Sequence, residues 1–372
     1  GAAQAGPEAK TREIMTVEVR YRGAGEDLVV GTLRQEGIDI FFQYDPDWAA
    51  YGWELAPILL PLSQTRPQLA QADRFRGLFP LFADSLPDWW GERLMQRYFQ
   101  SIGKDWGRVT MLERLCCQGD RAMGALTYAP DLRGDEKWDL DEVDLDALTA
   151  EALEALRGET GVVLAELLRS GQSAGGAQPK AVLGISEDGR KVVSGEGELP
   201  PEYHPWLVKF DTGPELEDGR AEFVCGLAAR AAGINMPELA LLESSDGRGH
   251  FGIKRFDREE GNARVHVQTF AALTGTPISE PIDYDNLLGL TRELTRDRTQ
   301  VEEMFRRAVF NVLLGNDDDH GKNHSFLMKA NGEWHLAPAY DVVQTGYPLG
   351  GGFRACSILG KGSKVELSLI HI

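Results

Sequence analysis

The stretch Asn316-Asp317-Asp318-Asp319-His320-Gly321-Lys322-Asn323 points most directly to the fold of this 372-residue chain. It follows an amphipathic segment, residues 301–314, which predicts a helix ended by Gly315. Asp318 precedes Asn323 by five positions, the spacing of the catalytic loop in protein kinases. In that loop the aspartate accepts the proton of the attacking hydroxyl, and the asparagine coordinates magnesium. The competing interpretation is an ordinary turn rich in Asn and Asp.

Three successive aspartates repel one another unless a cation or solvent compensates their charge. A further aspartate, Asp341, stands 18 positions after Asn323, in the stretch Pro338-Ala339-Tyr340-Asp341-Val342. A β-hairpin predicted over residues 326–334 would bring Asp341 back beside the Asp318 loop. Protein kinases carry a second magnesium-binding aspartate at this place.

Lys209 lies in the apolar run Trp206-Leu207-Val208-Lys209-Phe210, which predicts a strand. A lysine inside such a strand needs a partner or loses its charge. In protein kinases a strand lysine holds the α- and β-phosphates of ATP, and a helix carboxylate orients that lysine. Glu222, early in a helix predicted over residues 220–232, is the expected partner. Alternatively, the head of Lys209 reaches solvent.

A run of small residues, Ser173-Ala174-Gly175-Gly176-Ala177-Gln178-Pro179-Lys180, precedes another predicted strand. Small residues let backbone N–H groups approach a phosphate, and a lysine at the end can neutralise it. The run is neither a Walker A loop nor GxGxxG, and a plain surface turn would explain it as well. The order of small-residue loop, strand lysine, Asp318 loop and late aspartate nevertheless favours phosphoryl transfer.

The composition excludes several classes of protein. The chain has 39 Lys+Arg and 58 Asp+Glu, a net charge of −19, which argues against a broad contact with nucleic-acid phosphates. Four cysteines without a CxxC pair indicate neither a zinc ribbon nor a disulfide scaffold, and they favour a cytoplasmic location. No apolar run approaches the length of a membrane span.

We predict an α+β, two-lobed protein-kinase-like fold with an N-terminal β module and a mainly helical C-terminal lobe. The module begins with an antiparallel meander predicted over residues 15–44, and an acidic stretch connects the module to the lobes. The expected parts are a flexible N-terminus (1–14), the β/α module (15–130), the acidic connection (131–160), an ATP-binding N-lobe (161–262) and a catalytic C-lobe (263–372).

With these motifs in place, the chain resembles the HipA family, serine/threonine kinase toxins of bacterial type II toxin–antitoxin systems. The resemblance extends over about residues 16–361. Its motifs are residues 173–180, 207–209, 255–258, 316–323 and 338–342, and residues 82–88 are similar to that family's N-terminal module.

The resemblance implies a kinase that uses ATP and Mg²⁺ to phosphorylate a protein Ser or Thr. By this resemblance, Asp318 would be the catalytic base, Asn323 and Asp341 would bind magnesium, and Lys209 would hold the ATP phosphates. The phosphate loop would consist of Gly175, Gly176, Ala177, Gln178 and Lys180, and the backbone of Lys254 and Phe256 would contact the adenine. The resemblance also implies that Ser173 is the autophosphorylated serine and that Glu222, His320 and Lys322 support the site. Autophosphorylation would expel the loop and lower activity.

The family also implies partners. They are a protein substrate, with aminoacyl-tRNA synthetases among those of the family, and a helix-turn-helix antitoxin through which DNA would be contacted indirectly. No membrane association is expected.

Two departures from the family pattern stand out. Pro179 replaces an acidic residue that is common before the loop lysine, which removes one N–H donor. The chain also ends soon after Asp341, so an incomplete C-lobe is expected. Two alternatives stay open: a metal-dependent phosphohydrolase that uses residues 317–320, and a catalytically silent pseudokinase that acts as a binding module.

Overall fold

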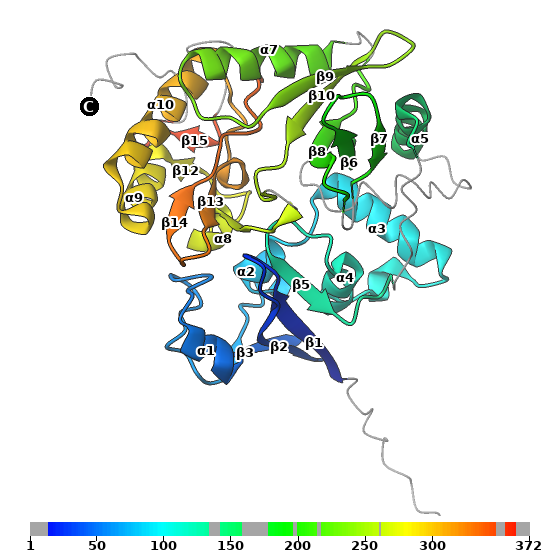
Figure 1. Ribbon diagram of the computed structural model, residues 1–372. Helices are drawn as coiled ribbons and strands as arrows, with labels where there is room; N and C mark the ends of the chain where they lie inside the picture. Colours follow the sequence, from blue (N-terminus) through cyan, green and yellow to red (C-terminus); the bar gives the residue numbers. More distant parts are fainter. Residues whose placement is uncertain are drawn as a thin grey trace, which may run out of the picture.

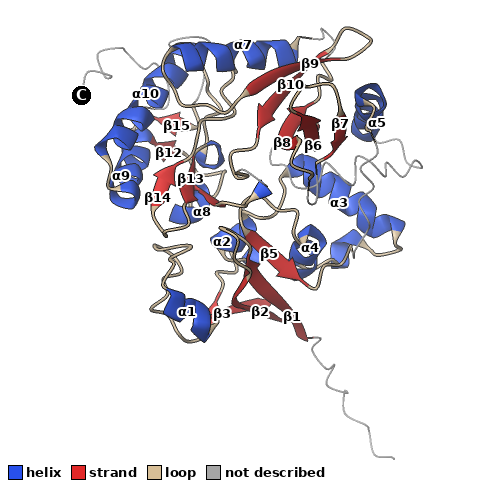
Figure 2. Ribbon diagram, viewed as in Figure 1, coloured by secondary structure: helices blue, strands red, loops and turns tan. Residues whose placement is uncertain are grey.

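The structure is a computed structural model that describes residues 14–133, 142–157, 178–195, 199–213, 217–259, 262–346 and 354–361. The described chain mixes helices with several sheets (Figure 2). From the N-terminus it builds a β/α module, a second five-stranded sheet, and a helical lobe that carries two small sheets (Figure 1). No helix within the described ranges is long and apolar enough to cross a bilayer.

The N-terminal module is built on a sheet of order β4-β3-β2-β1-β5. Alternate side chains of β1, namely Val17, Val19 and Tyr21, are buried, which is the pattern of a strand with one face on the core. The predicted meander is confirmed. The elements are β1 (Ile14–Tyr21), β2 (Leu28–Glu36), β3 (Asp39–Tyr44), β4 (Gln68–Leu69), β5 (Leu126–Ala129), α1 (Pro46–Tyr51), α2 (Pro80–Ala83), α3 (Trp89–Ser101), α4 (Met111–Gln118) and the 3-10 turns η1 (Phe75–Gly77) and η2 (Trp106–Arg108).

The second sheet is antiparallel, of order β7-β6-β8-β10-β9. Its elements are β6 (Lys180–Ser186), β7 (Val192–Ser194), β8 (Tyr203–Lys209), β9 (Leu239–Glu243), β10 (Gly249–Lys254), α5 (Leu145–Arg157) and α7 (Asp218–Ala231). Side chains alternate between the faces, so Trp206 and Val208 pack with α3 and α5, whereas Lys209 faces α7. The strands and the helix predicted here are confirmed, and Gly233, with φ +81°, follows the end of α7.

The helical lobe contains α8 (Phe270–Thr274), α9 (Tyr284–Thr295), α10 (Arg298–Leu314), the 3-10 turn η4 (Gly321–Asn323), β11 (His266–Thr269), β12 (Ile282–Asp283), β13 (Ser325–Met328), β14 (Trp334–Leu336) and β15 (Cys356–Ser357). Asp297 caps the start of α10, and Gly315, with φ +78°, ends it as predicted. Strands β13 and β14 pair as the predicted hairpin, and β12 pairs in parallel with β15.

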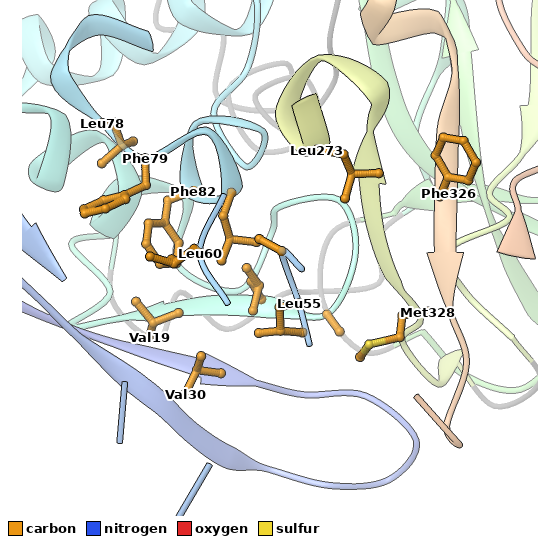
Figure 3. Close-up of a cluster of buried hydrophobic side chains, with 14 of the residues drawn as sticks. Val19, Val30, Leu55, Leu60, Leu78, Phe79, Phe82, Leu273, Phe326 and Met328 are labelled. Atoms are coloured by element: carbon orange, nitrogen blue, oxygen red, sulfur yellow. The ribbon is translucent and has the colours of Figure 1, made fainter. Parts of the chain in front are cut away.

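One hydrophobic core joins the N-terminal module to the helical lobe (Figure 3). In it, module side chains such as Val19 and Phe82 belong to the same buried cluster as Leu273, Phe326 and Met328. Hydrogen bonds also cross between the two parts, for example from Trp334 Nε1 to the carbonyl of Glu54 at 3.3 Å. The lobe is therefore held against the module by apolar burial as well as by polar contacts.

Candidate active site

Lys209 lies at the centre of the site, where the last residue of β8 faces α7. Its side chain is buried, and Nζ lies 2.6 Å from Glu222 Oε1 and 2.5 Å from Asp341 Oδ1. Burial alone would lower the pKa of Lys209, but the charges of Asp341 and Glu222 outweigh it and raise the pKa above its usual value. The ammonium group therefore stays charged and ties together three segments far apart in the chain.

Asp341 lies in the loop after β14, in the left-handed conformation with φ +52°. Nδ2 of Asn316 donates to its carbonyl oxygen at 3.3 Å, which holds the backbone at this point. Burial opposes ionisation of the carboxyl, but Lys209 and Lys180 more than compensate and lower its pKa to about 2. Asp341 is therefore ionised at neutral pH, and its side chain is still 32% exposed.

Lys180 begins β6 and lies opposite Lys209 in the antiparallel ladder. Its side chain is buried, and Nε1 of Trp90 donates to its carbonyl oxygen at 3.0 Å. Burial, followed by the charge of Lys209, lowers the pKa of Lys180 to about 8. Two basic groups thus lie on one face of the sheet beside Asp341.

Asp318 is exposed at the tip of the loop between α10 and η4. Its carbonyl oxygen accepts from Asn323 Nδ2 at 2.9 Å and from the N–H of His320 at 2.9 Å, so the main chain is held while the carboxylate faces outward. Asn323 and Asp341 line one small cavity, together with Asn316 and Tyr340. The structure thus brings the Asp318 loop and the late aspartate together.

The two neighbours of Asp318 are held by an arginine that follows them in the chain. Arg354 is buried and reaches Asp317 Oδ1 at 3.1 Å and Asp319 Oδ2 at 3.0 Å. Asp319 is fully buried and also accepts from the hydroxyl of Tyr284 at 2.5 Å. Arg354 is thus the cation that compensates these two carboxylates. A metal-ligand role for them, as the phosphohydrolase alternative requires, conflicts with these contacts. The described residues contain no group of three or more His, Cys, Asp or Glu side chains placed to hold a metal ion.

His320 and Lys322 hold different positions in the loop. Nζ of Lys322 forms an ion pair with Asp88, in the turn before α3. The carbonyl oxygen of Lys322 accepts a hydrogen bond from the hydroxyl of Tyr340 at 2.7 Å. Nδ1 of His320 is buried and has no hydrogen-bond partner among the described residues. Lys322 thus connects the loop to the N-terminal module.

In the segment expected to contact an adenine, residues 254–256, two backbone N–H groups already have hydrogen-bond acceptors within the protein. The N–H of Lys254 donates to the carbonyl of Glu238, and that of Arg255 donates to the carbonyl of Pro205, each at 2.9 Å. The side chain of Lys254 lies 3.5 Å from the Glu238 carboxylate. The ring of Phe256 lies 5.5 Å from that of Tyr340, so this segment contacts the chain next to Asp341.

Most of the small-residue run lies outside the described residues. Ser173, Gly175, Gly176 and Ala177 fall there, so nothing in the structure bears on their expected roles. Gln178 is described, and its Nε2 donates to the carbonyl of Phe210 at 3.4 Å.

Two carboxylates that support the site lie in motifs of the family resemblance, residues 82–88 and 255–258, but the sequence did not indicate what they contact. Asp257 is buried, accepts hydrogen bonds from Arg255 and Arg258, and accepts the N–H of Gly124 at 2.8 Å. Asp84 accepts from the N–H and the hydroxyl of Thr269, at 2.7 and 2.8 Å. These carboxylates join the module to the segments that carry the site, because the backbone N–H groups that they accept, those of Gly124 and Thr269, lie more than a hundred residues away.

Models of two protein families match the chain. The model described as "HipA-like C-terminal domain" matches residues 172–370, and that described as "HipA N-terminal domain" matches residues 24–129. The predicted family resemblance is thereby confirmed over both parts.

Two relatives and one solved structure extend the similarity. A putative kinase, Y4mE, of Sinorhizobium fredii is 30% identical over 348 residues, which cover 86% of this chain and 76% of the relative. The serine/threonine-protein kinase toxin HipA of Shewanella oneidensis is 26% identical over 366 residues, 90% of this chain and 76% of the toxin. A structure of the Shewanella oneidensis MR-1 HipA, HipB and operator DNA complex superposes with a TM-score of 0.62 at 21% identity, over 88% of this chain and 76% of that one. This match confirms the predicted α+β, kinase-like fold.

Proposed function

The chain belongs to the HipA family, and we propose that it transfers the γ-phosphate of ATP to a serine or threonine of a protein. The observation that carries this proposal is the contact of Lys209 with both Glu222 and Asp341. A strand lysine paired with a helix carboxylate is the arrangement that protein kinases need in order to hold the ATP phosphates. The phosphohydrolase alternative leaves this buried, charged lysine without a role.

Asp341 and Asn323 would hold Mg²⁺ on the nucleotide. The pair offers an ionised carboxylate and an amide whose nitrogen faces the carbonyl of Asp318, so that the amide oxygen is left for the metal. Mg²⁺ is commonly bound by one or two carboxylates together with phosphate oxygens and water, so these donors fit a magnesium–nucleotide complex. When bound, the metal neutralises charge on the phosphates.

Asp318 would act as the base. Its carboxylate accepts the proton of the substrate hydroxyl while the hydroxyl oxygen forms a bond to the γ-phosphorus, and the bond from that phosphorus to the bridging oxygen of ADP breaks. The exposure of Asp318 supports this role, because a protein substrate must reach it. Lys209 and Lys180 would stabilise the phosphate charge from the sheet.

We further propose that the backbone of Lys254 and Phe256 meets the adenine. Because the N–H groups of Lys254 and Arg255 already have acceptors, the N–H of Phe256 is the donor we assign to the base. Gly175, Gly176, Ala177 and Gln178 would line the phosphates, and Ser173 would be autophosphorylated. His320 and Lys322 would keep the catalytic loop in place.

The same family membership supports a partner. The solved relative from Shewanella oneidensis was captured with HipB and operator DNA. We propose that this chain likewise binds a helix-turn-helix antitoxin and contacts DNA only through it, and that its substrate is a protein such as an aminoacyl-tRNA synthetase.

Labelled ATP tests the proposed activity. Incubated with Mg²⁺ and [γ-³²P]ATP, the chain should label itself or an added protein, and Asp318→Asn should lower the rate by about 10²–10⁴-fold. Asp73→Asn, an exposed aspartate of the N-terminal module, is the matched control and should keep the wild-type rate. Undiminished labelling by Asp318→Asn would contradict the assignment of the base. Release of free phosphate from phosphoesters, without labelled protein, would favour the hydrolase, and nucleotide binding without turnover would favour the pseudokinase.

A further inference from the structure

We propose that Arg354 is a positioning residue, which holds the Asp318 loop in its working geometry from both sides. This inference rests on the proposed kinase function. Of the three consecutive aspartates, Asp318 is exposed, Asp317 is partly buried and Asp319 is fully buried. One guanidinium group engages both of the less exposed carboxylates.

The contacts of Arg354 bracket Asp318 along the chain. Nη1 donates to Asp317 Oδ1 at 3.1 Å, and Nη2 donates to Asp319 Oδ2 at 3.0 Å and to the carbonyl of Asn316 at 2.8 Å. The loop is therefore anchored just before and just after the proposed base. A guanidinium group suits this task because its donors are planar, rigid and always charged.

The backbone next to Arg354 reinforces the same anchor. The N–H of Ala355 donates to the carbonyl of Asp317 at 2.9 Å, and the N–H of Cys356 donates to Asp319 Oδ1 at 3.2 Å. Cys356 also pairs with Ile282 in the ladder between β15 and β12. Arg354 is thus fixed to a strand, and its position does not depend on its own side chain alone.

Electrostatics explains why an arginine is required. Three adjacent carboxylates repel one another, and a buried one without a cation takes up a proton or moves toward solvent. With Arg354 present, Asp317 and Asp319 are neutralised by short contacts, and Asp318 is left as the carboxylate that faces out. Without it, the loop loses three anchors and Asp318 moves; a misplacement of about 1 Å can cost on the order of 10²-fold in rate.

Arg354→Met tests the role by separating kcat from KM. We expect kcat for phosphoryl transfer to fall by roughly 10–100-fold, while KM for ATP changes by less than about threefold, because Lys209 and Asp341 lie outside the loosened loop and keep their places. The matched control is Arg121→Met. Arg121 is an equally buried arginine of the N-terminal module, bonded to Asp131 Oδ1 at 2.7 Å, and its loss should leave kcat unchanged in the folded protein.

A double variant distinguishes positioning from stability alone. Arg354→Met with Asp319→Asn removes the buried charge that the single variant leaves unpaired, so Tm should recover while kcat stays low. Recovery of kcat together with Tm would overturn the proposal. Hydrogen exchange provides a readout without activity: amides of residues 316–323 should exchange faster in the double variant, and unchanged exchange would also overturn it. A wild-type chain that labels no protein would count against the proposed function, and hydrogen exchange would still decide whether Arg354 holds the loop.

Discussion

Nζ of Lys209 lies 2.5 Å from Oδ1 of Asp341, although 132 residues separate the two in the chain. The same nitrogen contacts Glu222, so one ammonium group is shared by a helix carboxylate and a loop carboxylate. The buried charge of Lys209 therefore holds the loop that carries Asp341 against the second sheet. A change in either carboxylate changes how firmly the other is held.

Glu222→Gln should weaken catalysis more than folding. The amide keeps the volume and can still accept from Lys209, so we expect the free energy of unfolding to fall by only about 1–2 kcal/mol. Asp341 becomes the sole counter-charge and is drawn to Lys209, so kcat/KM for ATP should drop by about tenfold or more. Glu243→Gln, which alters an exposed pair with Arg220, is the control. An unchanged kcat/KM in Glu222→Gln would contradict the coupling.

The affinity for ATP should decrease as the pH rises above about 8. The pKa of Lys180 is lowered to about 8 by burial and by Lys209, so the charged form dominates below that pH and disappears above it. Phosphates bind the charged form, so Kd for ATP should increase between pH 8 and pH 10. Lys180→Arg keeps the charge and should remove this dependence in a titration series. The same pH dependence in both proteins would exclude Lys180 as its source.

Asp84→Ala should loosen the contact between the N-terminal module and α8. Thr269 loses the acceptor of its N–H and of its hydroxyl, and we expect the free energy of unfolding in urea to fall by about 2–3 kcal/mol. Asp27→Ala removes an exposed carboxylate paired with Arg20 and should cost less than about 1 kcal/mol. Equal losses in the two variants would show that the Asp84 contact contributes no more than a surface ion pair.

Asp257 should contribute to stability only while it is ionised. Burial opposes its charge, but Arg255 and Arg258 outweigh burial and hold its pKa well below the usual 3.8. A lowered pKa in the folded state stabilises the protein above pH 4, and this contribution is lost as the pH falls below 4. Asp257→Asn should therefore cost about 3 kcal/mol at pH 7 and show a flatter loss of stability between pH 4 and pH 2, measured by urea unfolding. An acid profile that matches the wild type would contradict this role.

The elements around the site could be predicted where their signals are local. The helix before Asp318 shows its period and its terminal glycine within a single stretch, and the hairpin that returns to Asp341 is short. Arg354 could not be predicted in this way, because it stands after three glycines and reaches partners 35 to 38 residues away. The repulsion among the three aspartates indicated that a cation or solvent must compensate their charge, but nothing in the sequence indicated that the cation would be Arg354.

Asp84 and Asp257 illustrate the same limit for the fold. Each is a single carboxylate in a mixed stretch, and its importance depends on a backbone N–H supplied by a distant segment. Such pairs follow from the packing of the N-terminal module on the lobe, and one-dimensional patterns of polarity do not encode that packing.

The core shared by the module and the helical lobe can form only after both parts have been synthesised. Glu54 and Trp334, which meet across that core, are 280 residues apart. A ribosome adds about 5–20 residues per second, so tens of seconds pass between their emergence. During this interval the module's apolar face lacks Phe326 and Met328 as a cover. A nascent chain therefore closes this core only after the helical lobe has been synthesised, and in that interval a chaperone or a binding partner can cover the exposed face.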